Sequence, residues 1–299
     1  MKISDDTEHG LEGATQLQAA NDGLLQTSKE QSCLLKVIRH YLDVCEIDMR
    51  EPVLVVGGGQ EDKEILTACG FEQIVLSNLG RTGTGLDAEN ISLPDDSYPV
   101  VFAHAVLHHC RCPQKALGEM VRVSQKHALF LEPNDSWTLH MLVRLGYSFP
   151  YELAAVAGNG YTRGGMRNGP IPNYIYRWTK EAVKSCVFAY HPERHFEIHA
   201  YPYWDFYVAE EDLLFRRESK VASLAETVGP RSLIAILHFA QALLNVVPLS
   251  RSQGNKFFCA ISKGELQPWI EIREGQYCLV RPAGLGDMVE RKRKGVGGG

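Results

Sequence analysis

The sequence predicts a doubly wound α/β fold, in which helices cover both faces of a mostly parallel sheet. Short continuous apolar runs, typical of strands buried on both faces, alternate with helical periodicity through the first half of the chain. The first run, 53–56, is followed at once by a glycine triplet, a helical stretch at 61–69 and a second apolar run at 74–76. This order of strand, glycine turn, helix and strand predicts a βαβ unit.

The other elements of the first half continue the alternation. Apolar residues recur at helical spacing in 32–44, and Gly70 stands where the helix of 61–69 should stop. The pattern then predicts a strand at 100–103, a helix at 114–123 and a strand at 128–131. A parallel sheet requires such crossover helices between its strands.

After residue 134 the rhythm breaks, and the chain becomes rich in Gly, Tyr and Pro up to about 195. Thr179 is a helix-capping residue, and we expect a helix to begin after it. A strand at 196–204, a mainly helical stretch at 210–247 and a final strand at 256–262 follow. We therefore expect a domain of 29–264, with 134–250 largely a cap inserted over the functional edge of the sheet.

Both ends of the chain are predicted to lie outside this domain. Residues 1–28 are polar and without a strong period, so we expect partial disorder there. In the C-terminal extension, 265–299, β-favouring residues flank Gly275, which predicts a hairpin over 269–280 and a disordered tail beyond it. Because an isolated hairpin is marginally stable, it should pack on the domain or on a second copy, which leaves a homodimer open.

Composition limits the function classes. The net charge of −5 gives no overall attraction to nucleic acid, so we expect no nucleic-acid partner. The N-terminus does not resemble a signal peptide and the cysteines are scattered, so we expect a cytoplasmic protein with reduced thiols. The apolar stretch 233–247 is short and contains His238 and Asn245, so no membrane span is predicted.

A dense run of metal-ligating residue types occupies 108–112, with the sequence His-His-Cys-Arg-Cys. Structural zinc sites take two separated ligand pairs, and no second pair is evident in this sequence. We therefore predict no metal site from the sequence.

Three features follow predicted strands, where parallel sheets bind ligands. Gly57, Gly58 and Gly59 end the first strand and let a ligand approach the backbone. Asn78 follows the second strand and can reach ribose hydroxyls. Asp87, with Ala88 beside it, can accept a hydrogen bond from an adenine amino group. The turn is not G-x-G-x-x-G, which argues against a dehydrogenase.

The segments that carry these features resemble class I S-adenosylmethionine-dependent methyltransferases, especially the broad group with small-molecule acceptors. The similar segments are 53–59, 87–89, 93–94 and 101–109, and the similarity extends over 50–135 and, moderately, over 256–263. The resemblance implies a seven-stranded Rossmann-like sheet and S-adenosylmethionine as cofactor. It also implies that the glycine turn meets the methionine end, that Asn78 holds the ribose, that Asp87 and Ala88 face the adenine, and that His104 lies in the cofactor site.

The predicted activity is transfer of a methyl group to a small-molecule acceptor, by O- or N-methylation, with a sugar or another natural-product intermediate as one possibility. His108 and His109 are base candidates because they follow a strand end and titrate near neutral pH, and Glu132 ends the next strand. We expect aromatic and basic residues of the cap to line the acceptor site, namely Tyr161, Arg163, Tyr174, Tyr176 and Trp178.

Two alternatives stay open. Gly57 and Asn78 stand where the family commonly has acidic residues, which favours an inactive binding protein of the same fold. The apolar stretch 233–247 could instead lie at a membrane interface and serve a lipid-linked acceptor.

Overall fold

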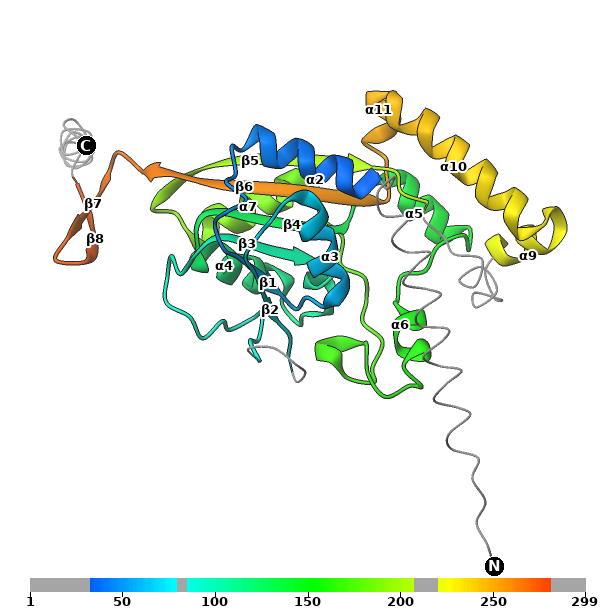
Figure 1. Cartoon of the computed structure of the whole chain (residues 1–299), viewed down its shortest axis with the longest axis horizontal. Helices are drawn as coiled ribbons and strands as arrows, with labels where there is room; N and C mark the ends of the chain where they lie inside the picture. The colour runs from blue at the N-terminus through cyan, green and yellow to red at the C-terminus, as the bar shows by residue number, and fades with distance from the viewer. Residues whose placement is uncertain (1–32, 80–84, 207–219, 281–299) are drawn as a thin grey trace, which may run out of the picture.

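The computed structural model describes residues 33–79, 85–206 and 220–280, and a six-stranded sheet forms its centre (Figure 1). The strands occur in the order β2-β1-β3-β4-β6-β5. Their bounds are Val53–Val56 for β1, Ile74–Ser77 for β2, Tyr98–His104 for β3, Ser124–Pro133 for β4, Arg194–Tyr203 for β5 and Lys256–Leu266 for β6. The pairs from β2 to β4 are parallel, whereas β6 is antiparallel to both of its neighbours.

The doubly wound α/β fold is confirmed, but the prediction of seven strands is corrected to six in the part of the chain that the structure describes. Between β2 and β3, the described residues add no further strand. Residues 85–97 there form no strand and contribute only an isolated bridge between Asp87 and Asn90. This segment is rich in Asp, Asn, Gly and Pro, residues that favour turns over strands.

Helices cover both faces of the sheet. The helices α2 (Cys33–Val44) and α3 (Gln60–Cys69) pack on one face, and α4 (Pro113–Val123) and α7 (Lys180–Tyr190) pack on the other. Successive strand residues alternate between the two hydrophobic cores, so Val53 and Val55 face α2 and α3 while Leu54 and Val56 face the opposite layer. All four residues of β1 are fully buried, as the continuous apolar run predicts.

The predicted helix boundaries are confirmed at two positions. Gly70 ends α3 in the left-handed conformation, with φ of 105°, and its N–H donates to Leu66 and Thr67 carbonyls. Thr179 caps α7 through its side chain, which accepts a hydrogen bond from the Ala182 N–H.

The stretch expected to be largely a cap, 134–250, divides into two parts. One part completes the main fold, because α7 packs on the sheet and β5 pairs with β6 along its length. The rest lies outside the sheet and contains α5 (Trp137–Arg144), α6 (Leu153–Gly158), the short 3₁₀ helix η2 (Met166–Asn168), α9 (Lys220–Val228), α10 (Pro230–Val246) and α11 (Pro248–Arg251).

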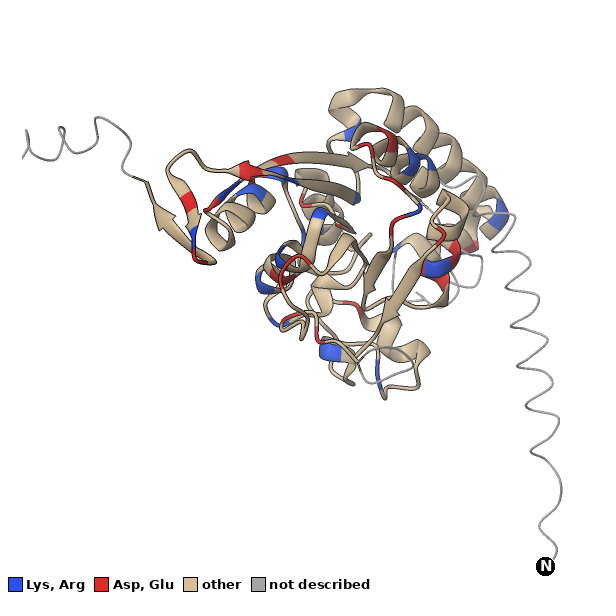
Figure 2. Ribbon diagram, turned by 60° about the vertical axis from the view of Figure 1, so that its left-hand side comes forward, with Lys and Arg blue, Asp and Glu red and all other residues tan. Residues whose placement is uncertain are grey.

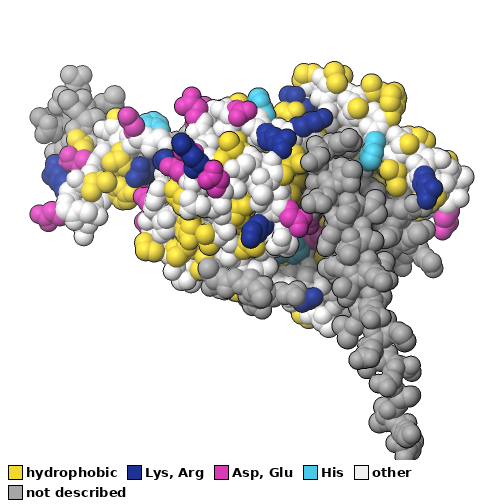
Figure 3. Space-filling model, in the orientation of Figure 1, with side chains coloured by type: hydrophobic (Ala, Val, Ile, Leu, Met, Phe, Trp, Pro, Cys, Tyr) yellow, Lys and Arg dark blue, Asp and Glu magenta, His cyan; other side chains and the backbone are white. Residues whose placement is uncertain are grey.

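The helix α10 has one face toward the body of the protein and one apolar face toward solvent. On the inner face, Asn245 accepts from the Trp204 N–H and donates to the Trp204 carbonyl. The outer face carries exposed apolar side chains at helical spacing, namely Ile236, Phe239, Leu243 and Val246. Hydrophobic side chains are visible on this helix in Figure 3.

None of the described helices is by itself long and apolar enough to cross a membrane. The pair α9 and α10, bent by 113°, meets this criterion of length and hydropathy when the two are taken together.

The predicted C-terminal hairpin is confirmed. Strand β7 (Ile270–Arg273) pairs antiparallel with β8 (Gln276–Leu279), and the two turn residues, Glu274 and Gly275, both have positive φ. The hairpin projects from the end of β6, and its Ile272, Tyr277 and Leu279 are exposed (Figure 1). The expected disordered segments, 1–28 and the tail from 287, lie outside the described residues.

Candidate active site

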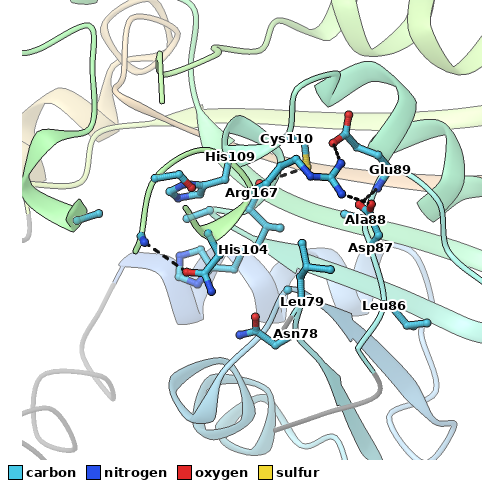
Figure 4. Close-up of a pocket in the computed structure, with 17 residues that line it drawn as sticks. Asn78, Leu79, Leu86, Asp87, Ala88, Glu89, His104, His109, Cys110 and Arg167 are labelled. Atoms are coloured by element: carbon cyan, nitrogen blue, oxygen red, sulfur yellow. Dashed lines mark hydrogen bonds and ion pairs between the residues drawn. The ribbon is translucent and has the colours of Figure 1, made fainter. Parts of the chain in front are cut away.

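A cavity of about 290 Å³ opens beyond the carboxyl ends of β1, β2 and β3. This is the edge at which open parallel sheets bind ligands. Six of the residues singled out in the sequence line it: Gly57, Asn78, Asp87, Ala88, His104 and His109. The segment from α6 to η2 contributes the opposite wall, through Ala155, Gly164, Gly165, Arg167 and Asn168 (Figure 4).

The three glycines of the turn after β1 have different roles. Gly57 lines the cavity with φ of +69°, and a Cβ atom there would lie 2.6 Å from a methyl group of Val106. A Cβ on Gly58 would collide with Val55, whereas a Cβ on Gly59 would meet nothing within 4 Å. The structure therefore requires glycine at positions 57 and 58, and only Gly57 borders the cavity.

An acid that the sequence reasoning missed connects this turn to His104. Asp62 accepts a hydrogen bond from the Gly59 N–H at 2.8 Å and lies 3.0 Å from Nδ1 of His104. The signal that could have found it is its place at the third position of α3, where an acidic side chain caps the helix. Asp62 thus fixes the ring of His104 at the cavity wall.

The far end of the cavity is acidic and is crossed by an arginine. The guanidinium of Arg167 lies 2.6 Å from Asp87 and 2.9 Å from Glu89, as Figure 4 shows. Asn78, at the end of β2, directs its amide toward the Gly58 carbonyl at 3.5 Å. Both sides of this end therefore offer polar groups suited to a ribose and an adenine.

Glu132 and His108 form a buried pair of ionisable residues next to the strand ends. Glu132, at the end of β4, accepts hydrogen bonds from the Val106 and Leu107 N–H groups and lies 2.5 Å from Nδ1 of His108. Its side chain is fully buried and does not reach the cavity. Glu132 therefore holds the 3₁₀ turn η1 (Leu107–His109) in place, and the predicted direct catalytic role is not supported by its position.

His108 lies between two carboxylates and is itself buried. Its Nε2 lies 3.1 Å from Glu152, opposite the Nδ1 contact with Glu132. Burial opposes the charged ring, but Glu132 and Glu152 outweigh burial and raise the pKa of His108 to about 10. A ring in this state cannot accept a proton, so His108 is not a free base.

His109 is the only one of the three predicted catalytic residues that lines the cavity. Its Nε2 lies 3.2 Å from Glu152, and its Nδ1 lies 3.3 Å from the Gly165 carbonyl. Burial and the neighbouring charge of His108 lower the pKa of His109, so its neutral form is favoured. Glu152, which contacts both histidines, was missed because it lies more than 40 residues along the chain, in the expected cap.

The residues expected to line the acceptor site are dispersed. Trp178 is fully buried against Phe130 in the core, and Tyr161 projects into solvent. The Arg163 side chain bonds to Asn159 on its own loop. Tyr174 and Tyr176 line a second cavity, of about 250 Å³. None of these five side chains lines the cavity at the strand ends.

The residues of the strand-end cavity fit the methionine, ribose and adenine parts of an adenosyl cofactor. Gly57 leaves the floor open, Asn78 and Asp87 offer hydrogen-bonding groups beyond β2, and Ala88 adds an apolar surface. A volume of about 290 Å³ lies at the lower end of the range for small-molecule sites.

Comparison with known proteins gives a family match to the segment that forms the strand-end wall of this cavity. Residues 36–131 match the protein-family model described as "Methyltransferase domain". No curated protein is significantly similar to the chain.

Solved structures that resemble the chain are distant in sequence. YcgJ of Bacillus subtilis is 11% identical with a TM-score of 0.38, and the match covers 77% of this chain and 97% of that one. A SAM-dependent methyltransferase of Archaeoglobus fulgidus is 13% identical with a TM-score of 0.40, covering 77% and 94%. A putative methyltransferase of Haloferax volcanii, in complex with the activator Trm112, is 11% identical with a TM-score of 0.43, covering 83% and 94%.

Proposed function

We propose that this chain, which belongs to the class I S-adenosylmethionine-dependent methyltransferases through the domain at 36–131, methylates a small-molecule acceptor. S-adenosylmethionine is the cofactor, and when bound it supplies a methyl group on a positively charged sulfur. The proposal concerns the acceptor and the residues that meet it.

The observation that carries the proposal is the wall formed by α6 and η2. Residues of these elements face the strand ends and limit the cavity to about 290 Å³. A wall that faces the strand ends across a space of this size favours a small acceptor beside the cofactor. Positions of Lys and Arg are interspersed with positions of Asp and Glu along the described ribbon, which gives a nucleic-acid partner no support (Figure 2).

The cofactor-binding roles follow from the cavity lining. The Gly57 backbone would meet the methionine end, Asn78 the ribose, and Asp87 with Ala88 the adenine. His104, oriented by Asp62, would complete the wall on the methionine side.

On the acceptor side, His109 is the group that meets the substrate. Its ring lies at the cavity, and Glu152 and the Gly165 carbonyl fix the ring position. A neutral imidazole has one lone pair, which can take a proton from an acceptor or bind a cation. His108 and Glu132 act through it, as positioning residues.

The test has two stages. Calorimetric titration with S-adenosylhomocysteine should give one site per chain, and a folded protein without such binding would refute the cofactor assignment. Incubation with methyl-labelled S-adenosylmethionine and separated cell fractions should then label small molecules. Label found only in protein or nucleic acid would refute the small-molecule acceptor.

A lipid-linked acceptor is a second candidate, and the outer face of α10 favours it. Ile236, Phe239 and Leu243 form an exposed apolar stripe on a helix, the arrangement by which interfacial helices enter a bilayer surface. Co-sedimentation with vesicles of anionic and neutral lipid would test it. Binding abolished in Phe239→Ser, together with methylation of a lipid fraction, would support this acceptor over a free small molecule.

A further inference from the structure

The cluster of His108, His109 and Glu152 has the geometry of a ligand set. One nitrogen of each ring and one carboxylate oxygen lie within 4.8 Å of one another. Both Nε2 atoms approach the same oxygen, Oε2 of Glu152, at 3.1 and 3.2 Å. If a cation lay about 2.1 Å from Oε2 and from one Nε2 atom, these separations would give an O–cation–N angle of roughly 95–100°. This angle is close to the one between adjacent ligands in octahedral coordination.

The other nitrogen of each ring already has the partner that metal-binding histidines have. Nδ1 of His108 meets the Glu132 carboxylate at 2.5 Å, and Nδ1 of His109 meets the Gly165 carbonyl at 3.3 Å. Such a partner on Nδ1 fixes the orientation of each ring. At His108 the cation would take the place of the Nε2 proton, since metal binding to histidine releases that proton. Both rings of the cluster are therefore oriented as ligands.

Hydrogen bonds alone leave this arrangement incomplete. A neutral His109 carries one ring proton, so only one of its two oxygen contacts can be a hydrogen bond. A second proton on His109 would make both rings positive, with the centroids of His108 and His109 4.5 Å apart and the Glu152 carboxylate shared between them. A cation at the Nε2 side removes the conflict, because Nδ1–H then donates to Gly165 while Nε2 and Glu152 both bind the cation.

A buried asparagine next to the cluster has one side-chain oxygen without a hydrogen-bond partner among the described residues. Asn173 is fully buried, donates from Nδ2 to the His108 carbonyl and accepts the Glu152 N–H at its own carbonyl. Its Oδ1 has no hydrogen-bond partner among the described residues. Buried acceptors are rarely left unpaired, so this oxygen is available to a water molecule or a cation next to the cluster.

We propose that His108, His109 and Glu152 bind a divalent transition-metal cation at the acceptor side of the cavity. Two imidazoles and one carboxylate favour such a cation over Mg²⁺ or Ca²⁺, which prefer oxygen ligands. His109 lines the cavity and Glu152 is partly exposed, so an acceptor in the cavity could reach a cation bound there. The remaining coordination positions of that cation would hold a hydroxyl of the acceptor and lower the pKa of that hydroxyl, with its proton released to water.

The role of the cation rests on the proposed function, but its binding does not. The sequence predicts no metal site because zinc patterns have two ligand pairs, whereas the third ligand here is a glutamate 43 residues beyond His109. Cys110 and Cys112 are not in the ligand set.

The test is titration of chelator-treated full-length protein with Co²⁺, followed by absorption spectroscopy. We expect one equivalent to bind, with weak d–d bands and without a thiolate-to-cobalt charge-transfer band. His109→Asn and Glu152→Gln should each weaken Co²⁺ binding at least tenfold. Both side chains are partly exposed, so these variants should fold; circular dichroism verifies it. His238→Ala, on the exposed surface of α10, is the matched histidine control and should bind as the parent does.

Three outcomes would overturn the inference. They are no Co²⁺ binding by the folded parent, equal affinity in both ligand variants, or a thiolate band that shows binding at cysteine. S-adenosylhomocysteine titration of the same samples separates the two proposals. If the parent protein binds Co²⁺ but not S-adenosylhomocysteine, the proposed function alone is refuted. If it binds S-adenosylhomocysteine but not Co²⁺, only the metal site is refuted.

Discussion

Replacement of Gly57 by alanine should destabilise the protein and narrow the cofactor cavity. The backbone at Gly57 has φ of +69°, a left-handed conformation that costs an L-residue about 1–2 kcal/mol. The new Cβ would also lie 2.6 Å from a methyl group of Val106, and such overpacking costs about 1–3 kcal/mol. We expect Gly57→Ala to lose about 2–5 kcal/mol of unfolding free energy, the sum of the two costs, measured by urea denaturation.

A second change separates the two causes. Val106→Ala removes both methyl groups that the new Cβ would strike and leaves only Cβ of residue 106, at 3.3 Å. In the double variant the steric part of the penalty should disappear while the backbone strain remains. The double-mutant cycle should therefore give a favourable coupling of about 1–3 kcal/mol.

Gly59→Ser is the matched control, because a side chain there meets nothing within 4 Å and serine is a favoured helix cap. This variant should unfold at the parent's urea midpoint within experimental error. The reasoning would be refuted if Gly57→Ala and Gly59→Ser were equally stable, or if Val106→Ala gave no rescue. Titration with S-adenosylhomocysteine should also weaken in Gly57→Ala, since Gly57 and Val106 both line the cavity.

Three further changes test the packing around the site. Gly118→Ala on α4 places a Cβ 2.7 Å from the Tyr190 ring and should lower the free energy of unfolding by about 1 kcal/mol, despite the helix preference of alanine. Urea denaturation measures this loss, and a stabilised variant would contradict the contact. Glu132→Gln removes the charge opposite His108 and should cost about 3 kcal/mol, read from the denaturation midpoint, and an unchanged midpoint would mean that the pair is not charged. Asn245→Ala removes the hydrogen bonds to the Trp204 N–H and carbonyl, which should cost about 1–3 kcal/mol of unfolding free energy and speed amide hydrogen exchange in α10 but not in β1. Equal exchange of α10 in the parent and in the variant would show that other contacts hold this helix.

The sequence by itself determined most of the fold, because the features involved are local. The buried run at 53–56, the stop at Gly70, the cap at Thr179 and the reversal at Gly275 each depend on residues within one turn or strand. Hydrophobic periods of 2 and 3.6 then assign each element its buried face. The seventh strand was the exception, since it was carried over from a resemblance and the turn-rich residues 85–97 do not support it.

The sequence also located the cofactor side of the site, for a topological reason. In a parallel sheet the residues that follow each strand meet at one edge, so Gly57, Asn78, Asp87 and His104 converge whatever the side-chain details. Knowledge of strand order and direction is enough to bring such residues together.

Only the tertiary structure decided how the acceptor side is built. The contacts of Glu152 with His108 and of Arg167 with Asp87 join residues 44 and 80 positions apart, through a loop whose path has no periodic signal. The same loop turns Tyr161 outward and buries Trp178, although both are aromatic residues of one segment. Side-chain direction in an irregular segment depends on the specific packing of the whole chain, so residue type and sequence position could not determine it.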